Sequence, residues 1–299
     1  MTGLTAEQVT QWRRNGLLSP FPLLSEAERQ ACLDGLHRFE AWLGGPVNGI
    51  EEMKWRSMPY LLMPWAADLA RDPRILDKVE ALIGPDILIY TSTFFIKEPG
   101  SPTIAAWHQD STYYGLAPAE EVTVWVALTE ANETAGCMEA LPYDGDPRQM
   151  RHRARVIENS VNRASQMIVE LLDDSRAVAM PLRPGEFSMH HGLCPHRSGP
   201  NRSSHRRIGL GLNYIPTSVR STGSARPAAM LVRGEDRYGH FDLLDPPGGE
   251  LDADAVATHD RALGLYRANY LEQEARHAAW VESSSSMVRS PPASNFPAA

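Results

Sequence analysis

The first third of the chain has apolar residues at helical spacing, framed by residues that begin and end helices. Residues 5–8 and 25–28 both have the capping-box pattern, in which a Ser or Thr caps a helix and the residue three positions later bonds back to it. Apolar residues three and four apart follow each box, which predicts one helix ending near Gly16 and another ending at Gly44. A third helix is expected over residues 72–84, because Asp-Pro begins it and Gly-Pro ends it.

The pattern then changes to short runs of β-branched and aromatic residues separated by turn residues, which is typical of strands. Helices do not alternate regularly with these strands. This order favours an antiparallel sandwich or barrel over a parallel α/β sheet. The predicted strands cover residues 87–97, 103–107, 122–129, 177–182, 187–190 and 207–215.

The segments around the strands have other patterns. Residues 146–176 are charged and are expected to be partly helical, and residues 217–255 are expected to form an ordered loop region. Residues 256–280 return to helical spacing. The simplest organisation is a single domain over residues 1–280, followed by a Ser- and Pro-rich tail at 281–299 that is expected to be disordered.

The composition of the chain argues against some classes of function. The formal net charge of −8 argues against nucleic-acid binding, which needs a dominant basic surface. Three cysteines, an odd number, do not make a disulfide framework and suit a reducing compartment. We find neither a signal-peptide pattern nor an apolar run near the ~20 residues of a membrane span. We therefore expect a soluble, cytoplasmic protein with a small-molecule partner, and the sequence leaves its oligomeric state open.

Two histidine motifs carry the candidate chemistry. His108-Gln109-Asp110 follows a strand-like run, and His196 lies far along the chain before a second one. Two His and one Asp are the ligand set of a facial Fe(II) site, which leaves three coordination positions open. Because alternate residues of a strand share a face, His108 and Asp110 are expected to grip a metal from one side. The alternative is a hydrogen-bonded structural pair without a metal.

Arg207 lies eleven residues after His196. If residues 199–205 form a hairpin turn, Arg207 returns beside His196 on the neighbouring strand. A guanidinium held there could bind the far carboxylate of a dicarboxylate whose keto-acid end chelates iron. Arg206 would then point to the opposite face of the strand.

Together, the motif from His108 to Asp110 and the motif from His196 through Ser198 and Asn201 to Arg207 resemble the phytanoyl-CoA dioxygenase (PhyH) family of Fe(II)/2-oxoglutarate oxygenases. The resemblance covers roughly residues 5–216. It implies a mainly β fold, a double-stranded β-helix (jelly roll, cupin-like) with an N-terminal helical layer. Residues 143–146 depart from the family pattern, so the loop beside the substrate is expected to be remodelled.

The resemblance also implies residue roles. His108, Asp110 and His196 would be the catalytic iron ligands. The residues expected to bind 2-oxoglutarate are Arg207, Ser198, Trp125 and Gln109. His190 and His191 are alternative ligands close to His196, for which a structural role is favoured, although His190 could face the pocket. His152 and His205 are expected to be solvated.

The expected function is hydroxylation of an unactivated C–H bond of a small organic molecule, with Fe(II), 2-oxoglutarate and dioxygen. Desaturation, epimerisation or cyclisation by the same iron chemistry stays open. Halogenation is disfavoured, because Asp110 fills the position that a halide would need. A cupin-like binding protein without turnover is the non-enzymatic alternative. Arginines near the motifs indicate either a solvated face or attraction for an anionic substrate.

Overall fold

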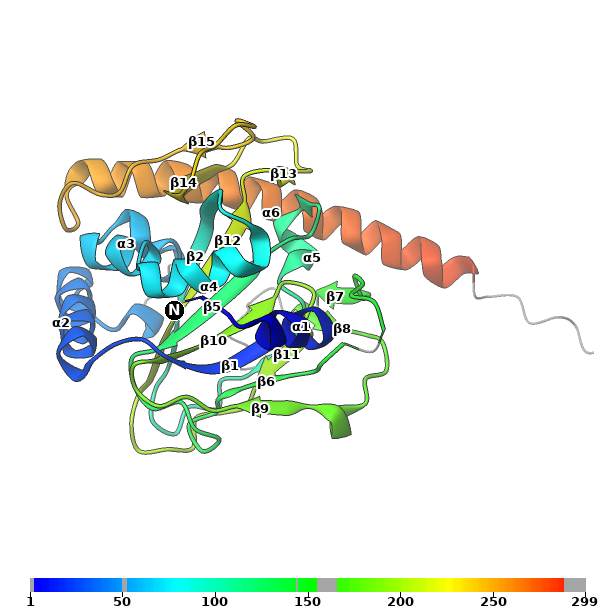
Figure 1. Ribbon diagram of the computed structural model, residues 1–299, viewed down its shortest axis with the longest axis horizontal. Coiled ribbons are helices and arrows are strands. Elements are labelled where there is room, and N and C mark those ends of the chain that lie inside the picture. The colour runs from blue at the N-terminus through cyan, green and yellow to red at the C-terminus, as the bar shows by residue number, and fades with distance from the viewer. Residues whose placement is uncertain (1–2, 50–52, 144, 155–165, 288–299) are drawn as a thin grey trace, which may run out of the picture.

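The computed structural model describes residues 3–49, 53–143, 145–154 and 166–287, and two facing β-sheets form its centre (Figure 1). This arrangement confirms the predicted jelly-roll fold. The larger sheet contains, in order, β1 (Leu17–Pro22), β10 (Glu186–His191), β5 (Val122–Ala127), β12 (Arg207–Pro216), β2 (Ile87–Lys97), β14 (Ala228–Arg233) and β15 (Asp242–Leu243). The smaller sheet contains β3 (Ala105–His108), β11 (His196–Ser198), β6 (Met138–Ala140) and β9 (Val178–Met180). Two further pairs are β4 (Leu116–Ala117) with β13 (Arg220–Ser221) and β7 (His152–Ala154) with β8 (Gln166–Ile168).

The three helices predicted near the N-terminus are all present. Thr5 and Ser25 cap the first two through the expected capping boxes, and Gly16 and Gly44 end them in the left-handed conformation. Asp72 caps the third, which Gly84 follows. The α-helices are α1 (Ala6–Asn15), α2 (Glu26–Leu43), α3 (Pro64–Ala70), α4 (Pro73–Ile83), α5 (Ser111–Tyr114) and α6 (Ala253–Met287). Short 3-10 turns are η1 (Val47–Gly49), η2 (Met53–Arg56), η3 (Pro59–Leu61) and η4 (Asp174–Arg176).

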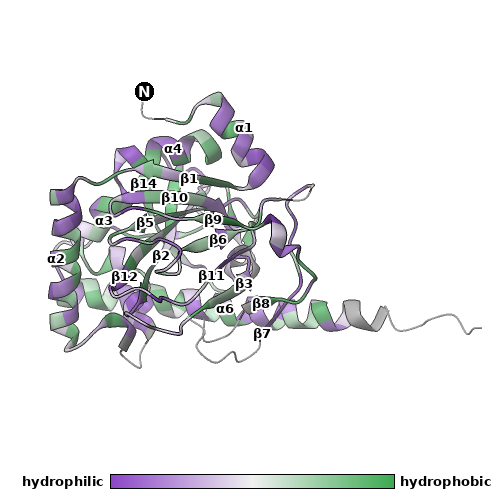
Figure 2. Cartoon of the chain, turned by 90° about the horizontal axis from the view of Figure 1, so that it is seen from below, coloured by the Kyte–Doolittle hydropathy of each residue, from purple (hydrophilic) through white to green (hydrophobic). Residues whose placement is uncertain are grey.

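Strand β12 separates the main apolar core from the site side of the larger sheet. All ten of its residues are buried. Leu210 and Leu212 belong to the core cluster that includes Leu36 and Phe39 of α2. Gly209 and Gly211 alternate with these leucines, and Gly209 faces Trp125 of β5. Figure 2 shows apolar strands inside the molecule and polar faces on the outer helices.

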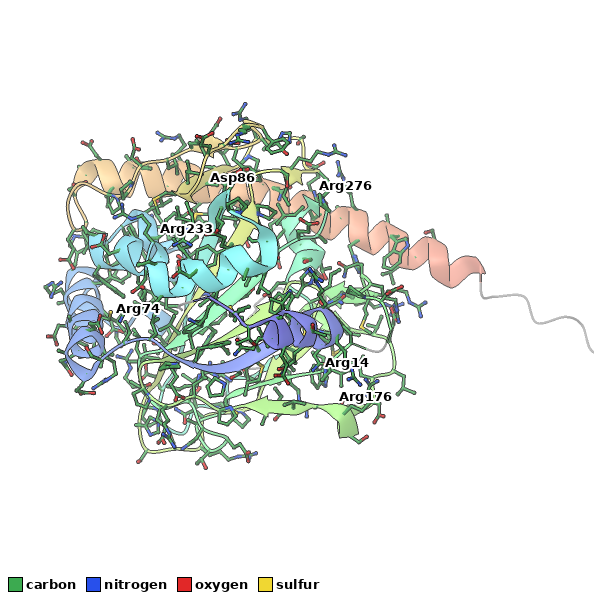
Figure 3. The ribbon with its side chains drawn as sticks, viewed as in Figure 1. Arg14, Arg74, Asp86, Arg176, Arg233 and Arg276 are labelled. Carbon is green, nitrogen blue, oxygen red and sulfur yellow. The ribbon has the colours of Figure 1, made fainter. Side chains whose placement is uncertain are left out.

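Ion pairs connect the helical layer to the strands at its surface. Arg233 of β14 binds Asp77 and Glu80 of α4 at 2.8 and 2.7 Å, and Arg74 of α4 binds Glu28 of α2 at 2.9 Å. Figure 3 shows Arg74 and Arg233 on this outer surface. Because exposed ion pairs contribute little, apolar packing holds the layer in place.

Some elements differ from the sequence predictions. Strand β1 was not predicted because it contains prolines, which an edge strand tolerates. The expected loop over residues 217–255 includes β14, which pairs with β2 in the larger sheet. Within residues 146–176, the described part forms strands β7 and β8 and the turn η4 instead of an α-helix, and residues 155–165 lie outside the described residues.

The C-terminal helix is longer than predicted. Helix α6 continues to Met287, so residues 281–287 are helical where a disordered tail was expected, and residues 288–299 lie outside the described residues. The helix runs along one side of the sheets and then projects beyond them (Figure 1). The boundary near residue 280 therefore does not end an element. Within the described ranges, no helix is both long and apolar enough to cross a membrane.

We expect Leu210→Ala to lower the free energy of unfolding by about 2–5 kcal/mol, because it leaves a cavity in the core under the helical layer. Leu210 is fully buried, whereas Leu171 is fully exposed. Leu171→Ala is therefore the matched control and should leave stability nearly unchanged. Urea unfolding measures both variants, and equal losses would contradict the placement of this core.

Candidate metal and cosubstrate site

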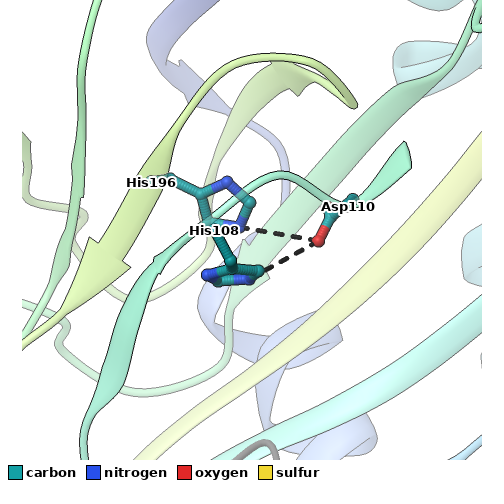
Figure 4. A group of neighbouring side chains, drawn as sticks. All are labelled: His108, Asp110 and His196. Carbon is teal, nitrogen blue, oxygen red and sulfur yellow. Dashed lines mark ion pairs between the residues drawn. The ribbon is translucent and has the colours of Figure 1, made fainter. Parts of the chain in front are cut away.

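The pairing of β11 with β3 brings the two histidine motifs together. His196 is the register partner of His108, and their ring centroids lie 4.1 Å apart. Asp110 lies beyond the end of β3, with helical backbone angles (φ −63°, ψ −42°) at the start of α5. The prediction that His108 and Asp110 share one strand face was therefore wrong. The turn into α5 brings the carboxylate to the two imidazoles instead (Figure 4).

The three side chains converge at metal-binding distances. Asp110 Oδ1 lies 3.6 Å from His108 Nε2 and 3.7 Å from His196 Nε2, and the three ligand atoms lie within 4.8 Å of one another. Such a triangle can surround a metal with bonds of about 2.0–2.2 Å. The Nδ1 atoms lie 2.8 and 3.0 Å from the carbonyl oxygens of Ala106 and Cys194. These carbonyls favour a proton on Nδ1, which leaves each Nε2 lone pair facing the centre.

The protonation states suit a divalent cation. Burial lowers the pKa of His108 and of His196 to about 4, so both rings are neutral at pH 7. Burial alone would raise the pKa of Asp110, but the surrounding His196, His190 and His108 lower it well below its usual value. Two neutral imidazoles and one carboxylate are therefore ready to bind metal without first losing protons.

The residues expected to bind 2-oxoglutarate lie next to this triad, with Gln109 as the exception. One cavity contains the triad together with Trp125, Ser198 and Arg207. The hairpin that was expected to bring Arg207 beside His196 does not form. His196 lies in the smaller sheet and Arg207 in the larger one, so the two face each other across the cavity. The remaining lining residues are Phe95, Ala105, Tyr114, Thr123, Met138, Arg197 and Asn213.

Two buried basic side chains lie next to each other on neighbouring strands of the larger sheet, and one of them, Arg207, lines this cavity. Arg207 is 3% exposed and its register partner Lys97 is 1% exposed. Arg207 donates to the carbonyl of Gly136, while its Nε has no hydrogen-bond partner. Lys97 Nζ donates to Ser198 Oγ at 2.8 Å and to the carbonyl of Gly199. Neither side chain has an ion-pair partner among the residues that the structure describes.

A positive charge on Lys97 or Arg207 is unfavourable without an anion. Burial lowers the pKa of Arg207 to about 10, and burial together with the nearby charge of Arg207 lowers the pKa of Lys97 to about 6. At pH 7 Lys97 is therefore largely neutral while Arg207 keeps its charge, and because an unpaired buried charge is costly, Arg207 marks a place where an anionic ligand would be stabilised. The sequence analysis missed Lys97, because only the pairing of β2 with β12 reveals its position.

Glycine makes room for the aromatic wall of this cavity. The Arg207 guanidinium lies 5.5 Å from the Trp125 ring, within cation–π range. A Cβ at Gly209 would lie 1.9 Å from Cζ2 of Trp125, so a larger residue there would displace the indole. Gly136, whose carbonyl Arg207 contacts, has a positive φ of 69°. A Cβ there would lie 2.3 Å from the carbonyl oxygen of Gly199.

Comparison with known proteins identifies the family. The model of the phytanoyl-CoA dioxygenase (PhyH) family matches residues 12–209. The chain belongs to the phytanoyl-CoA dioxygenase family. The resemblance seen in the sequence is therefore confirmed. The expected enzyme class is also confirmed at the level of the family, which consists of oxygenases that use Fe(II), 2-oxoglutarate and dioxygen.

Individual relatives are distant. A probable alpha-ketoglutarate-dependent hypophosphite dioxygenase of Stutzerimonas stutzeri is 27% identical over 189 residues, which are 62% of each chain. The chain thus spans less than two thirds of that relative. The structure of the non-heme monooxygenase ThoJ without metal is 27% identical with a TM-score of 0.78, covering 89% of this chain and 98% of ThoJ. The carbocyclase SnoK, 23% identical with a TM-score of 0.58 over 84% of this chain and 95% of SnoK, shows the fold alone.

Gln109 does not line the cavity that contains the triad. Its side-chain amide donates to the carbonyls of Arg148 and Leu193 at 2.9 and 2.6 Å, and its Oε1 accepts from Gln149 and Met150. The geometry therefore favours a structural role in place of the expected cosubstrate contact. His152, expected to be solvated, is 1% exposed, and its Nε2 accepts the backbone N–H of Gln109 at 3.0 Å. That expectation was wrong, because the ring lies beneath the loop that contains Gln109.

A crystal structure with bound Fe(II), or with Ni(II) or Co(II) in its place, tests the proposed ligands. We expect one metal bound by His108, Asp110 and His196 at about 2.0–2.2 Å. The two histidines should keep their Nδ1 contacts to backbone carbonyls. A metal bound elsewhere, with these three side chains outside coordination distance, would refute the assignment.

Proposed function

We propose that this protein is an Fe(II)/2-oxoglutarate-dependent dioxygenase that hydroxylates an unactivated C–H bond of a small organic molecule and releases succinate and carbon dioxide. The observation that carries the proposal is the content of one cavity. It holds both a 2-His-1-carboxylate set and the buried Arg207. This matches a dicarboxylic keto acid, which needs a metal at its keto end and a cation at its far carboxylate.

The residues of the site would have the following roles. His108, Asp110 and His196 hold the metal from one side and leave its other positions open. Arg207 and Ser198 bind the far carboxylate of 2-oxoglutarate, and Trp125 forms the wall beside it. Bound Fe(II) and 2-oxoglutarate supply the chemistry that activates dioxygen for C–H oxidation. The protein provides the orientation and the burial that keeps water away.

A larger hollow of about 520 Å³ borders the metal cavity at Ala105, Arg197 and Ser198, but Trp107 and Arg197, which line it, alternate with His108 and His196 along their strands and so point to the other face of the smaller sheet. Its lining includes the apolar side chains of Ile104, Trp107, Met167, Ile168, Leu171 and Leu172.

The arginines near this hollow are already paired with carboxylates. Arg197 binds Glu139 and Asp174 at 2.7 and 2.6 Å, and its guanidinium lies 4.6 Å from the Trp107 ring. Arg148 binds Glu170 at 2.7 Å. Because carboxylates already pair with these arginines, the cluster gives little support to attraction of an anion.

Three alternatives differ in what they require of the site. Halogenation needs an open position where Asp110 stands, so the side chain disfavours it. Desaturation, epimerisation or cyclisation needs the same ligands, and SnoK shows that this fold also serves a carbocyclase. A binding protein without turnover would keep the cavity but consume no 2-oxoglutarate.

Turnover of 2-oxoglutarate tests the enzyme proposal directly. Purified protein with Fe(II) and dioxygen should convert 2-oxoglutarate to succinate, at a higher rate when a substrate is present. Asp110→Ala removes the anionic ligand and should abolish succinate formation. Mass spectrometry of the organic product then separates hydroxylation, a gain of one oxygen, from the other outcomes. Binding of 2-oxoglutarate without succinate would establish the binding-protein alternative instead.

Arg207→Ala should weaken 2-oxoglutarate binding by about two to three powers of ten. Leaving the buried carboxylate without its partner costs about 3–5 kcal/mol, at ~1.4 kcal/mol for each power of ten. Anaerobic titration of the Fe(II) protein with 2-oxoglutarate measures the change, and Fe(II) affinity should stay the same.

The neighbouring residue supplies the control. Arg206 binds Glu40 and Glu98 at 2.7 and 3.0 Å, away from the cavity. Arg206→Ala should therefore leave 2-oxoglutarate affinity close to that of the wild type. Unchanged affinity in both variants would exclude Arg207 as the anchor.

A further inference from the structure

A fourth imidazole lies against the proposed metal ligands. His190 of β10 is 2% exposed, and its ring centroid lies 4.3 Å from that of His196. Its Nε2 lies 3.3 Å from Oδ2 of Asp110. It is not one of the three residues whose ligand atoms gather within 4.8 Å. His190 therefore contacts the metal site from outside, through the carboxylate.

The two oxygens of Asp110 have different surroundings. Oδ1 faces Nε2 of His108 and of His196 at 3.6 and 3.7 Å. Oδ2 faces the opposite way, where it accepts a hydrogen bond from Thr123 Oγ1 at 3.1 Å and lies beside His190 Nε2. Thr123 and His190 are register partners in the pairing of β5 with β10. The sheet therefore presents two donors to one carboxylate oxygen.

Among the residues that the structure describes, Asp110 is the one partner that forms a side-chain hydrogen bond with His190. The other ring nitrogen, Nδ1, is buried and has no hydrogen-bond partner among the described residues. A ring nitrogen at this distance from a carboxylate oxygen must carry a proton, because two acceptors would repel each other. The ring therefore donates from Nε2 to Oδ2 of Asp110, and this hydrogen bond best explains why the ring is buried at this position.

We propose that His190 is a positioning residue which, together with Thr123, holds Oδ2 of Asp110 so that only Oδ1 can bind the metal. A carboxylate held in this way contributes one ligand atom and leaves three coordination positions open for 2-oxoglutarate and dioxygen. Without His190 the carboxylate can rotate, so it binds the metal less firmly or takes a further position with its second oxygen. This inference rests on the proposed function, because it requires a metal at the triad.

The adjacent histidine provides a matched control. His191 is the next residue of β10, so its side chain points to the other face of the strand. Its Nδ1 accepts the backbone N–H of Leu193 at 3.1 Å, and its ring packs against Trp12 and Tyr143 with centroid distances of 6.1 Å. It makes no contact with the triad in the described structure, so His191→Phe tests the loss of a half-buried imidazole from the same strand.

Metal affinity, measured without turnover, is the decisive quantity. Metal-free protein is titrated anaerobically with Co(II), followed by the visible absorption of the bound ion, and with Fe(II) in a competition assay. His190→Phe should bind both metals about tenfold to a hundredfold more weakly, which is the usual range when a hydrogen-bond partner of a metal ligand is removed. His190→Gln, which keeps a donor, should recover part of the loss, and His191→Phe should bind like the wild type.

Thermal unfolding of the metal-free proteins separates positioning from general stability. The proposal holds if His190→Phe and His191→Phe melt at similar temperatures while only the first loses metal affinity. It is overturned if His190→Phe binds metal like the wild type, or if Gln restores nothing and both phenylalanine variants lose affinity equally. Should His190→Phe fail to fold, Thr123→Val removes the other donor to Oδ2 and should weaken metal binding in the same direction; unchanged affinity there would overturn the proposal.

These results are independent of the proposed reaction. If the wild-type protein binds Co(II) and Fe(II) but forms no succinate, the proposed function fails while the role of His190 is still decided. If it binds neither metal, the inference about His190 fails together with the metal assignment.

Discussion

The register between β3 and β11 is the constraint on which the rest of the site depends. It sets His108 opposite His196, and the turn after β3 then needs only two residues to bring Asp110 to the same point. A one-residue shift of either strand would turn a ligand to the other face of the sheet. Neighbouring pairings fix this register, because β6 also pairs with β11 and aligns Ala140 with His196.

Burial gives the site its chemical character. The same exclusion of water that keeps His108 and His196 neutral makes the charge of Arg207 costly without an anion. Within the cavity, the triad thus suits a metal cation and Arg207 suits a carboxylate. A molecule that carries a keto acid at one end and a carboxylate at the other can satisfy both at once.

The core and the site share the same strands. In β12, Leu210 and Leu212 face the helices, while Gly209 leaves room for Trp125 on the other face. In β10 and β5, His190 and Thr123 reach the carboxylate of Asp110. The larger sheet is therefore both the wall of the apolar core and the support that orients the metal ligands. A change in the packing of the larger sheet is therefore expected to alter the positions of the metal ligands.

The sequence alone predicted many of the local elements and a candidate ligand set. The capping boxes, the glycine stops and the β-branched runs lie within short stretches of chain, so the three N-terminal helices and the strand over residues 87–97 could be predicted. The spacing from His108 to Asp110, and from His196 to Arg207, was enough to indicate an iron and 2-oxoglutarate site.

Only the tertiary structure decided how these residues meet. Strand pairing put His196 and Arg207 in different sheets, placed Lys97 beside Arg207, and brought His190 to Asp110, all through contacts between segments distant in the chain. It also directed Gln109 toward the backbone of its surrounding loops, although it lies between two ligands. Sequence patterns report the period and the ends of an element, whereas register and sheet order arise from packing of the whole chain.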